Sequence, residues 1–515
     1  MSTPPNTTDD RAPLLYRAIV ALLRVAVWAF FRRVEVIGRR QIPAGGCGLV
    51  VSWHPNGLVD PGLVLTQFPR QIVFGARHGL FGYPLLGFVL RRLGTVPIYR
   101  AMDAGRRGGE LDAAAAKAAR EAARREANRR SLDALAAAIA AGSYAALFPE
   151  GISHDAPHLT EIKSGFARLY YRARQLRAAA GASPPVIVPV GLHYDRKQMF
   201  RSNALVAFHA PLELPPELDV TPAVDEDPEA DKQRVRALTA LVESTLREVV
   251  HATDDWALHD LMQRTRRMVR AERAALADAD PGRTTIEERV LGFARVRAGY
   301  YALEQSHPEQ VAALRRRVEE YDADLRALQL EDYDLDRGPS LLSPWLAILL
   351  VLQAIGVFLL LPPLIVVGYA VNLPTALLLR GIARLGAKLE KDEATIKLLV
   401  GWVLFQATWV AAGFGAAMVH EQLHAMYPAL PRTPALAGVT LALLAALGGA
   451  IAVRYLRVAR EVGRAVRVRL TRSRRWIAVQ RLRIERRRLC EDILALAQGL
   501  ELPGSVADDG RVLPG

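Results

Sequence analysis

A histidine and an aspartate with five residues between them follow a short apolar run early in the chain, at His54 and Asp60. A histidine whose ring is held by a carboxylate can remove the proton of an alcohol, so that the alcohol oxygen becomes a nucleophile. This chemistry requires no covalent nucleophile on the protein. The pair also has a structural interpretation, because Asp60 followed by Pro61 is a typical start of a helix.

Three further sequence blocks are found in the 140 residues or so that follow. Arg100 ends the second block. Glu150 and Gly151 come directly after another apolar run, and Lys163 follows them. The fourth block is the apolar run Val188–Leu192. The chain must therefore bring several short segments together if these residues form one site.

The elements that position these blocks alternate in type. Residues Val34 to Leu214 pass from short apolar runs to helical stretches and back, which predicts an α/β domain. The expected strands are Leu49–Trp53, Ile72–Gly75, Thr95–Tyr99, Tyr144–Phe148, Val186–Leu192 and Ala204–His209. A long helix rich in alanine, arginine and glutamate is expected from Leu111 to Ala141.

Composition indicates a membrane partner. The 515 residues exceed one ordinary domain, and 67 basic against 53 acidic residues give a net charge of +14. Such a charge suits nucleic acid, an anionic membrane or phosphorylated substrates. Long apolar segments favour the membrane, and the arginine-rich C-terminal tail has few aromatic residues, so no nucleic-acid partner is expected. The two cysteines, Cys47 and Cys490, predict neither a disulfide framework nor a zinc site.

The predicted domains follow changes in composition. An N-terminal helix carries arginines within its apolar sequence, so it is expected to lie in the membrane interface rather than to cross it, and no cleaved signal peptide is expected. A proline pair and an acidic run mark a linker after the α/β domain. The predicted divisions are 1–36 for the interfacial helix, 37–215 for the α/β domain, 216–340 for a helical connecting domain, 341–456 for a membrane region and 457–515 for a basic helical tail.

The membrane region contains three apolar segments, Leu341–Val371, Leu398–Val419 and Leu436–Val453. The first is broken by a proline pair, which predicts a re-entrant hairpin, whereas the other two have the length of membrane spans. The connection Asn372–Lys397 holds five basic residues and His420–Pro434 holds one arginine. Because basic loops stay in the cytoplasm, a hairpin followed by two spans predicts an integral membrane protein with its α/β domain facing the cytoplasm.

One motif suggests an unrelated chemistry. His420, Glu421 and His424 form a His-Glu-x-x-His sequence, which on a helix can bind zinc and hydrolyse peptides. No third histidine at the expected spacing follows. Polarity at the end of a membrane helix is therefore the favoured interpretation, and no metal site is expected.

In order and in spacing, the four blocks resemble the glycerolipid acyltransferase family, which acylates glycerol phosphates and lysophospholipids. The common family signature has four residues between histidine and aspartate, whereas this chain has five. The longer interval and the block from Phe148 to Asp155 resemble the branch that contains the fungal glycerol-3-phosphate/dihydroxyacetone-phosphate O-acyltransferases and their bacterial relatives. The similarity extends over most of the chain.

The resemblance implies a role for each residue. His54 becomes the general base on the acceptor hydroxyl, and Asp60 orients it. Arg100 and Lys163 become ligands of the acceptor phosphate. Glu150 either positions an acceptor hydroxyl or fixes its loop, and Gly151 belongs to the same substrate-binding block.

The sequence departs from the family at one position. Many members have an arginine two residues after the glycine of the third block, where this chain has Ser153. His154, Lys163 or Arg201 can then supply the missing contact to phosphate. Backbone amides near Gly57 or Gly151 are the expected donors to the oxyanion.

The resemblance implies a membrane-bound enzyme of phospholipid biosynthesis without a cofactor. It would transfer an acyl group from an acyl thioester, acyl-CoA or acyl carrier protein, to glycerol 3-phosphate or dihydroxyacetone phosphate. Acylation of lysophosphatidic acid or of another lysophospholipid is the alternative. A non-catalytic membrane scaffold is a third, more distant hypothesis.

Overall fold

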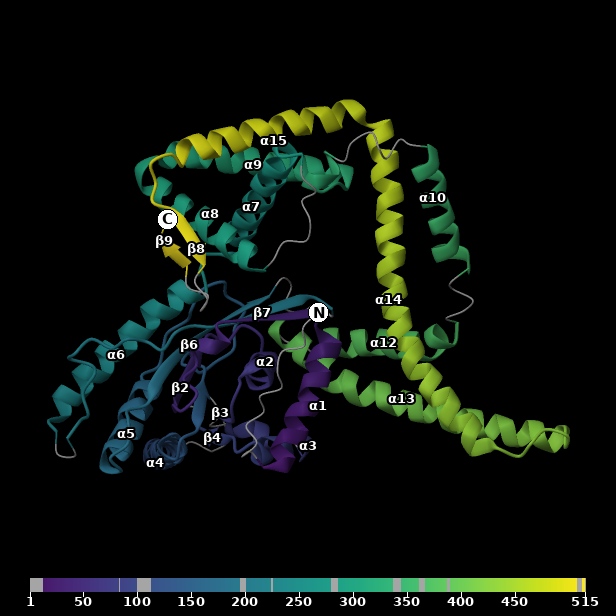
Figure 1. The fold of residues 1–515 in the computed structure, drawn as a ribbon. Coiled ribbons are helices and arrows are strands. Elements are labelled where there is room, and N and C mark those ends of the chain that lie inside the picture. Colours follow the sequence, from purple (N-terminus) through teal and green to yellow (C-terminus); the bar gives the residue numbers. More distant parts are fainter. Residues whose placement is uncertain are drawn as a thin grey trace. The chain divides into compact units, whose positions relative to one another are not determined.

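A computed structural model describes residues 13–82, 84–99, 113–194, 201–223, 226–278, 286–336, 344–360, 366–386, 390–506 and 512–514 (Figure 1). The chain forms two compact units. The first is built mainly from the residues up to Trp256, and the second mainly from the residues after it. Each unit has its own set of elements and is described by itself.

The first unit is built on a sheet that has seven strands within the described residues. The strands are β1 Arg33–Ile37, β2 Gly48–Ser52, β3 Ile72–Arg77, β4 Val96–Ile98, β5 Tyr144–Leu147, β6 Val186–Tyr194 and β7 Asn203–Phe208. Their order across the sheet is β1-β7-β6-β2-β5-β3-β4, and among these strands only the β6–β7 pair is antiparallel. The predicted α/β class is therefore confirmed for this unit.

The two central strands, β2 and β5, carry the first and third sequence blocks at their carboxyl ends. They pair in parallel, with Val51 opposite Leu147. All five residues of β2 are buried. A parallel pair that is covered on both faces needs such a continuous apolar sequence. Because the strands run side by side, the loops that follow them meet at the same edge of the sheet.

All six predicted strands form, each end within two residues of the expected one, and β1 is an additional edge strand. Its sequence places Arg33 and Glu35 on one face, where the two side chains pair at 2.8 Å. The alternation of Val34, Glu35 and Val36 with half-buried positions is typical of an edge strand, although β1 was not among the predicted strands. It pairs in parallel with β7.

The helices of the first unit cover the sheet and include the predicted long helix. They are α1 Leu14–Phe30, α2 Val59–Gln67, α3 Pro84–Arg92, α4 Ala113–Ala140, α5 Gly165–Ala179 and α6 Pro228–Val249. Helix α1 packs against α2, and its Tyr16 hydroxyl donates to the carbonyl of Ile72. On its outer face Leu14 and Trp28 are 81% and 72% exposed. The interfacial position of this helix, predicted from the arginines within its apolar sequence, stays a prediction.

The second unit consists almost entirely of helices. They are α7 Trp256–Leu276, α8 Ile286–Ser306, α9 Pro308–Leu328, α10 Pro344–Ile355, α12 Val366–Gly386, α13 Glu390–Met426, α14 Pro434–Arg474 and α15 Trp476–Leu496. A π-helical turn, Gly356–Leu360, continues α10. A short pair of strands near the C-terminus, β8 Pro503–Val506 and β9 Val512–Pro514, belongs mainly to the first unit.

Within the described residues, two helices are long and apolar enough to cross a membrane, over Val400–Met426 and Pro434–Ala452. They include most of the two segments that the sequence analysis predicted as spans. Helix α12, in contrast, occupies much of the predicted basic loop. Asn372 on α12 donates to the carbonyl of Ala445 on α14 and accepts from the Trp409 indole on α13, each at 2.8 Å.

Helices α12 and α14 approach closely because both have a glycine at the contact. A Cβ atom added to Gly368 would lie 2.6 Å from the carbonyl oxygen of Gly448. Small residues and interhelical hydrogen bonds are the usual features of helix packing in membranes. The segment from residue 366 to residue 386 is therefore a helix packed against the two candidate spans, and it includes much of the predicted basic connection.

Candidate active site

His54 and Asp60 form a hydrogen-bonded pair after strand β2. His54 follows the strand end by two residues, and Asp60 lies in the first turn of α2. The Nδ1 atom of His54 is 2.8 Å from Oδ2 of Asp60. The histidine side chain is 14% exposed, whereas the aspartate side chain is fully buried. With Nδ1 directed at the carboxylate, Nε2 is the ring nitrogen that can accept a proton from a substrate.

A helix does begin at this motif, at Val59, but Asp60 lies in its first turn and does not cap it. The N-cap of α2 is Leu58, and its side chain makes no cap hydrogen bond. The Asp60 carboxylate instead accepts from the amide of Asn56 at 2.7 Å and from the hydroxyl of Tyr194. With His54, these donors fix both carboxylate oxygens.

Tyr194 is a member of the site that the sequence analysis missed. It is the last residue of β6, two positions beyond the fourth block. Burial raises the pKa of its phenol well above the usual value, and the charge of Asp60 raises it further. The hydroxyl therefore keeps its proton and donates it to Asp60. The signal in the sequence was the position at the end of a strand, but a tyrosine there is equally common as a packing residue.

Glu150 connects the loop after β5 to the loop after β2. Its side chain is fully buried. Oε2 accepts from the backbone amide of His54 at 2.8 Å. Oε1 accepts from the amide of Thr160 at 2.9 Å and lies 2.6 Å from Nε2 of His154. Both oxygens are thus engaged by the protein itself.

His154 was one of the residues expected to replace the missing arginine at a phosphate. The structure places its side chain at 10% exposure against Glu150. Its backbone amide donates to the carbonyl of His54 at 3.1 Å. His154 therefore ties the two loops together and does not present its ring to solvent.

Gly151 makes a tight turn next to the histidine. Its φ angle of +69° lies in the left-handed region, which favours glycine. Its amide donates to the carbonyl of Phe148 at 2.9 Å, so this amide is not available as an oxyanion donor. The Phe148 ring stacks on the His54 ring with centroids 4.1 Å apart and holds the imidazole plane. Gly57, the other expected neighbourhood for donors, has a φ of +47°.

Of the three remaining residues expected to bind phosphate, the structure describes two, Lys163 and Arg201. Arg100 lies outside the described residues. The Lys163 side chain is 57% exposed and pairs with Glu161 at 2.5 Å, while its amide donates to Pro149 in the third block. Arg201 donates to the carbonyl of Trp28 at 3.2 Å, so its guanidinium binds the end of α1.

The His-Glu-x-x-His sequence holds a turn together. His424 Nδ1 lies 2.7 Å from the carbonyl oxygen of Leu430, and His420 Nε2 lies 3.0 Å from that of Pro431. Glu421 pairs with Arg432 at 2.5 Å. Among the described residues, no group of three or more histidine, cysteine, aspartate or glutamate side chains could hold a metal ion.

Comparison with known proteins identifies the region that carries this site. A family model described as Acyltransferase matches residues 33–193. Glycerol-3-phosphate O-acyltransferase 1 of Saccharomyces cerevisiae is 25% identical over 53% of this chain and 33% of its own length. An uncharacterised acyltransferase of Schizosaccharomyces pombe is 22% identical over 39% of this chain and 40% of its own.

Among solved structures, the 1-acyl-sn-glycerophosphate acyltransferase of Thermotoga maritima is similar at 18% identity and a TM-score of 0.29, over 45% of this chain and 80% of that one. The chain spans between about a third and two fifths of the length of the two fungal relatives. The family resemblance of the four sequence blocks is confirmed for the matched region. Residues 33–193, which hold His54, Asp60 and Glu150, form an acyltransferase domain.

Proposed function

We propose that the protein is a membrane-bound O-acyltransferase that moves a fatty acyl group from an acyl thioester to a hydroxyl of glycerol 3-phosphate or dihydroxyacetone phosphate. The observation that carries the proposal is the 2.8 Å contact between His54 Nδ1 and the buried Asp60 carboxylate. This contact leaves Nε2 for the acceptor hydroxyl. The name of the Saccharomyces cerevisiae relative supports glycerol 3-phosphate as the acceptor.

In the proposed reaction, Nε2 of His54 takes the proton of the acceptor hydroxyl while the oxygen attacks the thioester carbonyl. A carbon–oxygen bond forms and the carbon–sulfur bond breaks. The imidazolium then returns its proton to the leaving thiolate. Asp60 stabilises the imidazolium because its carboxylate lies on the opposite ring nitrogen. Tyr194 and the Asn56 amide hold that carboxylate in place.

Glu150 acts in this proposal by fixing the loop that carries the base. Its contacts to the His54 amide and to Thr160 support this role over direct binding of the acceptor hydroxyl. Arg100 is proposed as a ligand of the acceptor phosphate, since a guanidinium binds phosphate with two hydrogen bonds. Lys163 is a second proposed ligand, which would have to exchange its pairing with Glu161 for the phosphate.

We place the acyltransferase domain on the cytoplasmic side of the membrane. The helices over Val400–Met426 and Pro434–Ala452 support membrane insertion. Between these two helices the chain has one basic residue apart from histidine, Arg432, whereas the sequence before and after them is rich in lysine and arginine. The bias of basic residues toward the cytoplasm then orients both ends of the chain inward.

A single assay tests which acceptor the protein acylates. The full chain, reconstituted in phospholipid vesicles, is given a radiolabelled acyl-CoA or acyl carrier protein and one of three acceptors: glycerol 3-phosphate, dihydroxyacetone phosphate or lysophosphatidate. The proposal expects labelled monoacyl phosphate from the first or second acceptor. Product from lysophosphatidate alone would assign the chain to the second acylation step instead, and the absence of product with every pair would contradict an acyltransferase function.

A further inference from the structure

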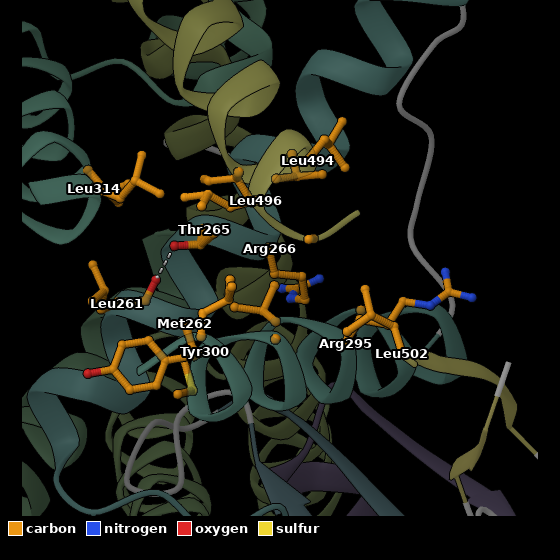
Figure 2. A pocket seen from close by; sticks show the side chains of 18 of the residues that line it. Leu261, Met262, Thr265, Arg266, Arg295, Tyr300, Leu314, Leu494, Leu496 and Leu502 are labelled. Carbon is orange, nitrogen blue, oxygen red and sulfur yellow. Dashed lines mark hydrogen bonds between the residues drawn. The ribbon is translucent and has the colours of Figure 1, made fainter. Parts of the chain in front are cut away.

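The helical unit contains a cavity that the proposed reaction does not use. It has a volume of about 410 Å³ and lies between α7, α8, α9 and α15 (Figure 2). This volume falls in the lower part of the range of small-molecule sites, about 300–1,000 Å³. Aliphatic side chains form most of the wall, among them Leu261, Met262, Val296, Leu303, Leu314 and Ile493.

The two hydroxyl groups of this wall are hydrogen-bonded within the protein. The Thr265 hydroxyl donates to the carbonyl of Leu261 at 3.0 Å. The Tyr300 hydroxyl donates to Glu304 at 2.9 Å, which leaves the ring edge and face as its contribution to the wall. The hydroxyl groups of the wall are therefore committed elsewhere, and the wall offers hydrocarbon surface to a ligand.

Charge is added to the wall by guanidinium groups. Among the described lining residues there are five arginines, Arg266, Arg270, Arg273, Arg295 and Arg315, against the single carboxylate of Glu288. Three of them follow one another on α7 at positions 266, 270 and 273, a spacing that puts them on one face of the helix. The earlier positions of that face, Met262 and Thr265, are uncharged.

Aliphatic and basic side chains line the cavity together. In Figure 2, Arg295 lies beside Leu502 and across the view from Leu261 and Leu314, and Arg266 lies between these two ends. The cavity also reaches the surface, since Leu494 in its wall is 42% exposed. A ligand that fits has an extended apolar part and an anionic group.

We propose that this cavity binds a single-chain lipid with an anionic headgroup. The aliphatic wall takes one acyl chain, because the transfer of hydrocarbon out of water is favourable. Arg270 and Arg273 take the carboxylate or phosphate of the headgroup through charge-assisted hydrogen bonds. The other three arginines of the wall also bind the protein itself: Arg266 donates to Gln263, Arg295 to the carbonyl of Pro503, and Arg315 pairs with Glu319. The volume suits one chain better than the two chains of a membrane phospholipid. This site is separate from the His54 site, and the proposal does not depend on the reaction catalysed there.

Gly299 on α8 offers a direct way to fill the cavity. A Cβ atom added there would meet only Leu502, at an ordinary contact distance of 3.7 Å. Gly299→Ala therefore fits without displacing the wall. Gly299→Phe extends a ring into the space that the acyl chain would occupy.

The test uses the full chain in phosphatidylcholine nanodiscs and a fatty acid that carries a photoreactive diazirine near its tail. After irradiation, labelled peptides are identified by mass spectrometry. We expect label on cavity residues of α8 and α15, competed by oleate and by 1-oleoyl lysophosphatidate but not by neutral monooleoylglycerol. The better competitor identifies the headgroup as carboxylate or phosphate.

Two matched pairs of variants complete the test. Gly299→Phe should reduce cavity labelling by about tenfold, which corresponds to a loss of about 1.4 kcal/mol, whereas Gly299→Ala should not. The double variant Arg270→Gln with Arg273→Gln should weaken competition by oleate, while Arg267→Gln, an exposed neighbour outside the cavity wall, should not.

Labelling confined to the membrane helices α13 and α14 would overturn the proposal. So would cavity labelling that a folded Gly299→Phe protein retains. If that variant does not fold, competition in the unaltered protein still decides, because monooleoylglycerol that competes as well as oleate would remove the anionic headgroup from the proposal.

Discussion

At the scale of single residues, the Asp60 carboxylate is the most constrained group of the active site. It is fully buried and accepts hydrogen bonds from His54, the Asn56 amide and Tyr194. A buried carboxylate needs such donors because it has lost its water. The position of the histidine base is therefore fixed by groups that come from β2, α2 and β6.

Tyr194→Phe tests this arrangement. A hydrogen bond to a charged group contributes about 1.5–3 kcal/mol, so its loss should lower the rate of acyl transfer by about tenfold or more while the fold is kept. The control is Tyr171→Phe, which removes a hydroxyl that donates to the carbonyl of Leu218 instead. The readout is kcat/KM of both variants.

The pH dependence of the Tyr194 effect has a fixed sign. Because burial raises the pKa of this phenol in the folded protein, its hydroxyl stays protonated up to and beyond its usual value. Its contribution is present below about pH 10 and is lost only as the pH rises through the raised value. The ratio of wild-type to Tyr194→Phe activity should therefore stay constant from pH 7 to 9, and a ratio that falls within this interval would contradict the assignment.

Glu150→Gln distinguishes the two roles considered for this residue. If the carboxylate fixes the loop, the NH2 group that replaces one oxygen faces the backbone N–H of His54 or Thr160 and cannot accept its hydrogen bond. The protein should then lose about 1–3 kcal/mol of stability. Thermal unfolding measures this loss. An unchanged unfolding temperature with a loss of acyl transfer would instead favour direct contact with the acceptor hydroxyl.

The sequence allowed His54, Asp60 and Glu150 to be predicted because each belongs to a motif that follows an apolar strand. It did not allow Tyr194 or His154 to be placed. A tyrosine at a strand end and a histidine in a loop have no distinctive spacing, and their role depends on which loops the sheet order brings together. The sheet order, in turn, depends on long-range pairing such as β2 between β5 and β6.

At the scale of elements, the strands were predicted more accurately than the connections. Continuous apolar runs such as Leu49–Val51 have few alternatives to a buried parallel strand. The segment from Asn372 to Lys397 was predicted as a connection between two apolar segments, and its charges were used to orient it. Much of it lies in α12, which packs against its neighbours through Asn372 and the Gly368–Gly448 contact, and neither hydropathy nor a charge count registers such packing.

Arg486 provides a second constraint at this scale, within the helical unit. Its side chain is 1% exposed and pairs with Glu272 at 2.8 Å and with Asp336 at 2.6 Å. Removing one partner of a buried ion pair leaves the other charge without compensation, so Arg486→Met should destabilise the protein by about 3–5 kcal/mol. The exposed neighbour Arg487 also pairs with Glu272, at 3.3 Å, and Arg487→Met should cost about 1 kcal/mol or less. Denaturant unfolding measures the free energy of unfolding of both variants. Equal losses of stability would contradict the prediction that the buried pair matters more.

At the scale of the whole molecule, the domain with the active site and the arginine-rich tail are both proposed to lie on the cytoplasmic side of one membrane. Two exposed positions test this placement by cysteine labelling of intact cells. Leu385 at the end of α12 is 92% exposed, and Tyr427 between the two candidate spans is 62% exposed. The native cysteines, Cys47 and Cys490, are both buried and should give little background.

A membrane-impermeant maleimide should label Tyr427→Cys from outside and should label Leu385→Cys only after the cells are permeabilised. Labelling of Leu385→Cys in intact cells would place the C-terminal end of α12 outside and would contradict the proposed orientation.

The central claim is that His54 is the base that activates the acceptor hydroxyl. The most direct measurement is the rate of acyl transfer by His54→Ala in vesicles, with membrane insertion and thermal unfolding measured on the same preparation. The backbone contact between His54 and Glu150 does not require the ring, so the fold should be kept. General-base catalysis contributes about 10²–10⁴-fold, so we predict a loss of at least about 100-fold with normal insertion. A folded, inserted variant that keeps more than about a tenth of the wild-type rate would contradict the claim.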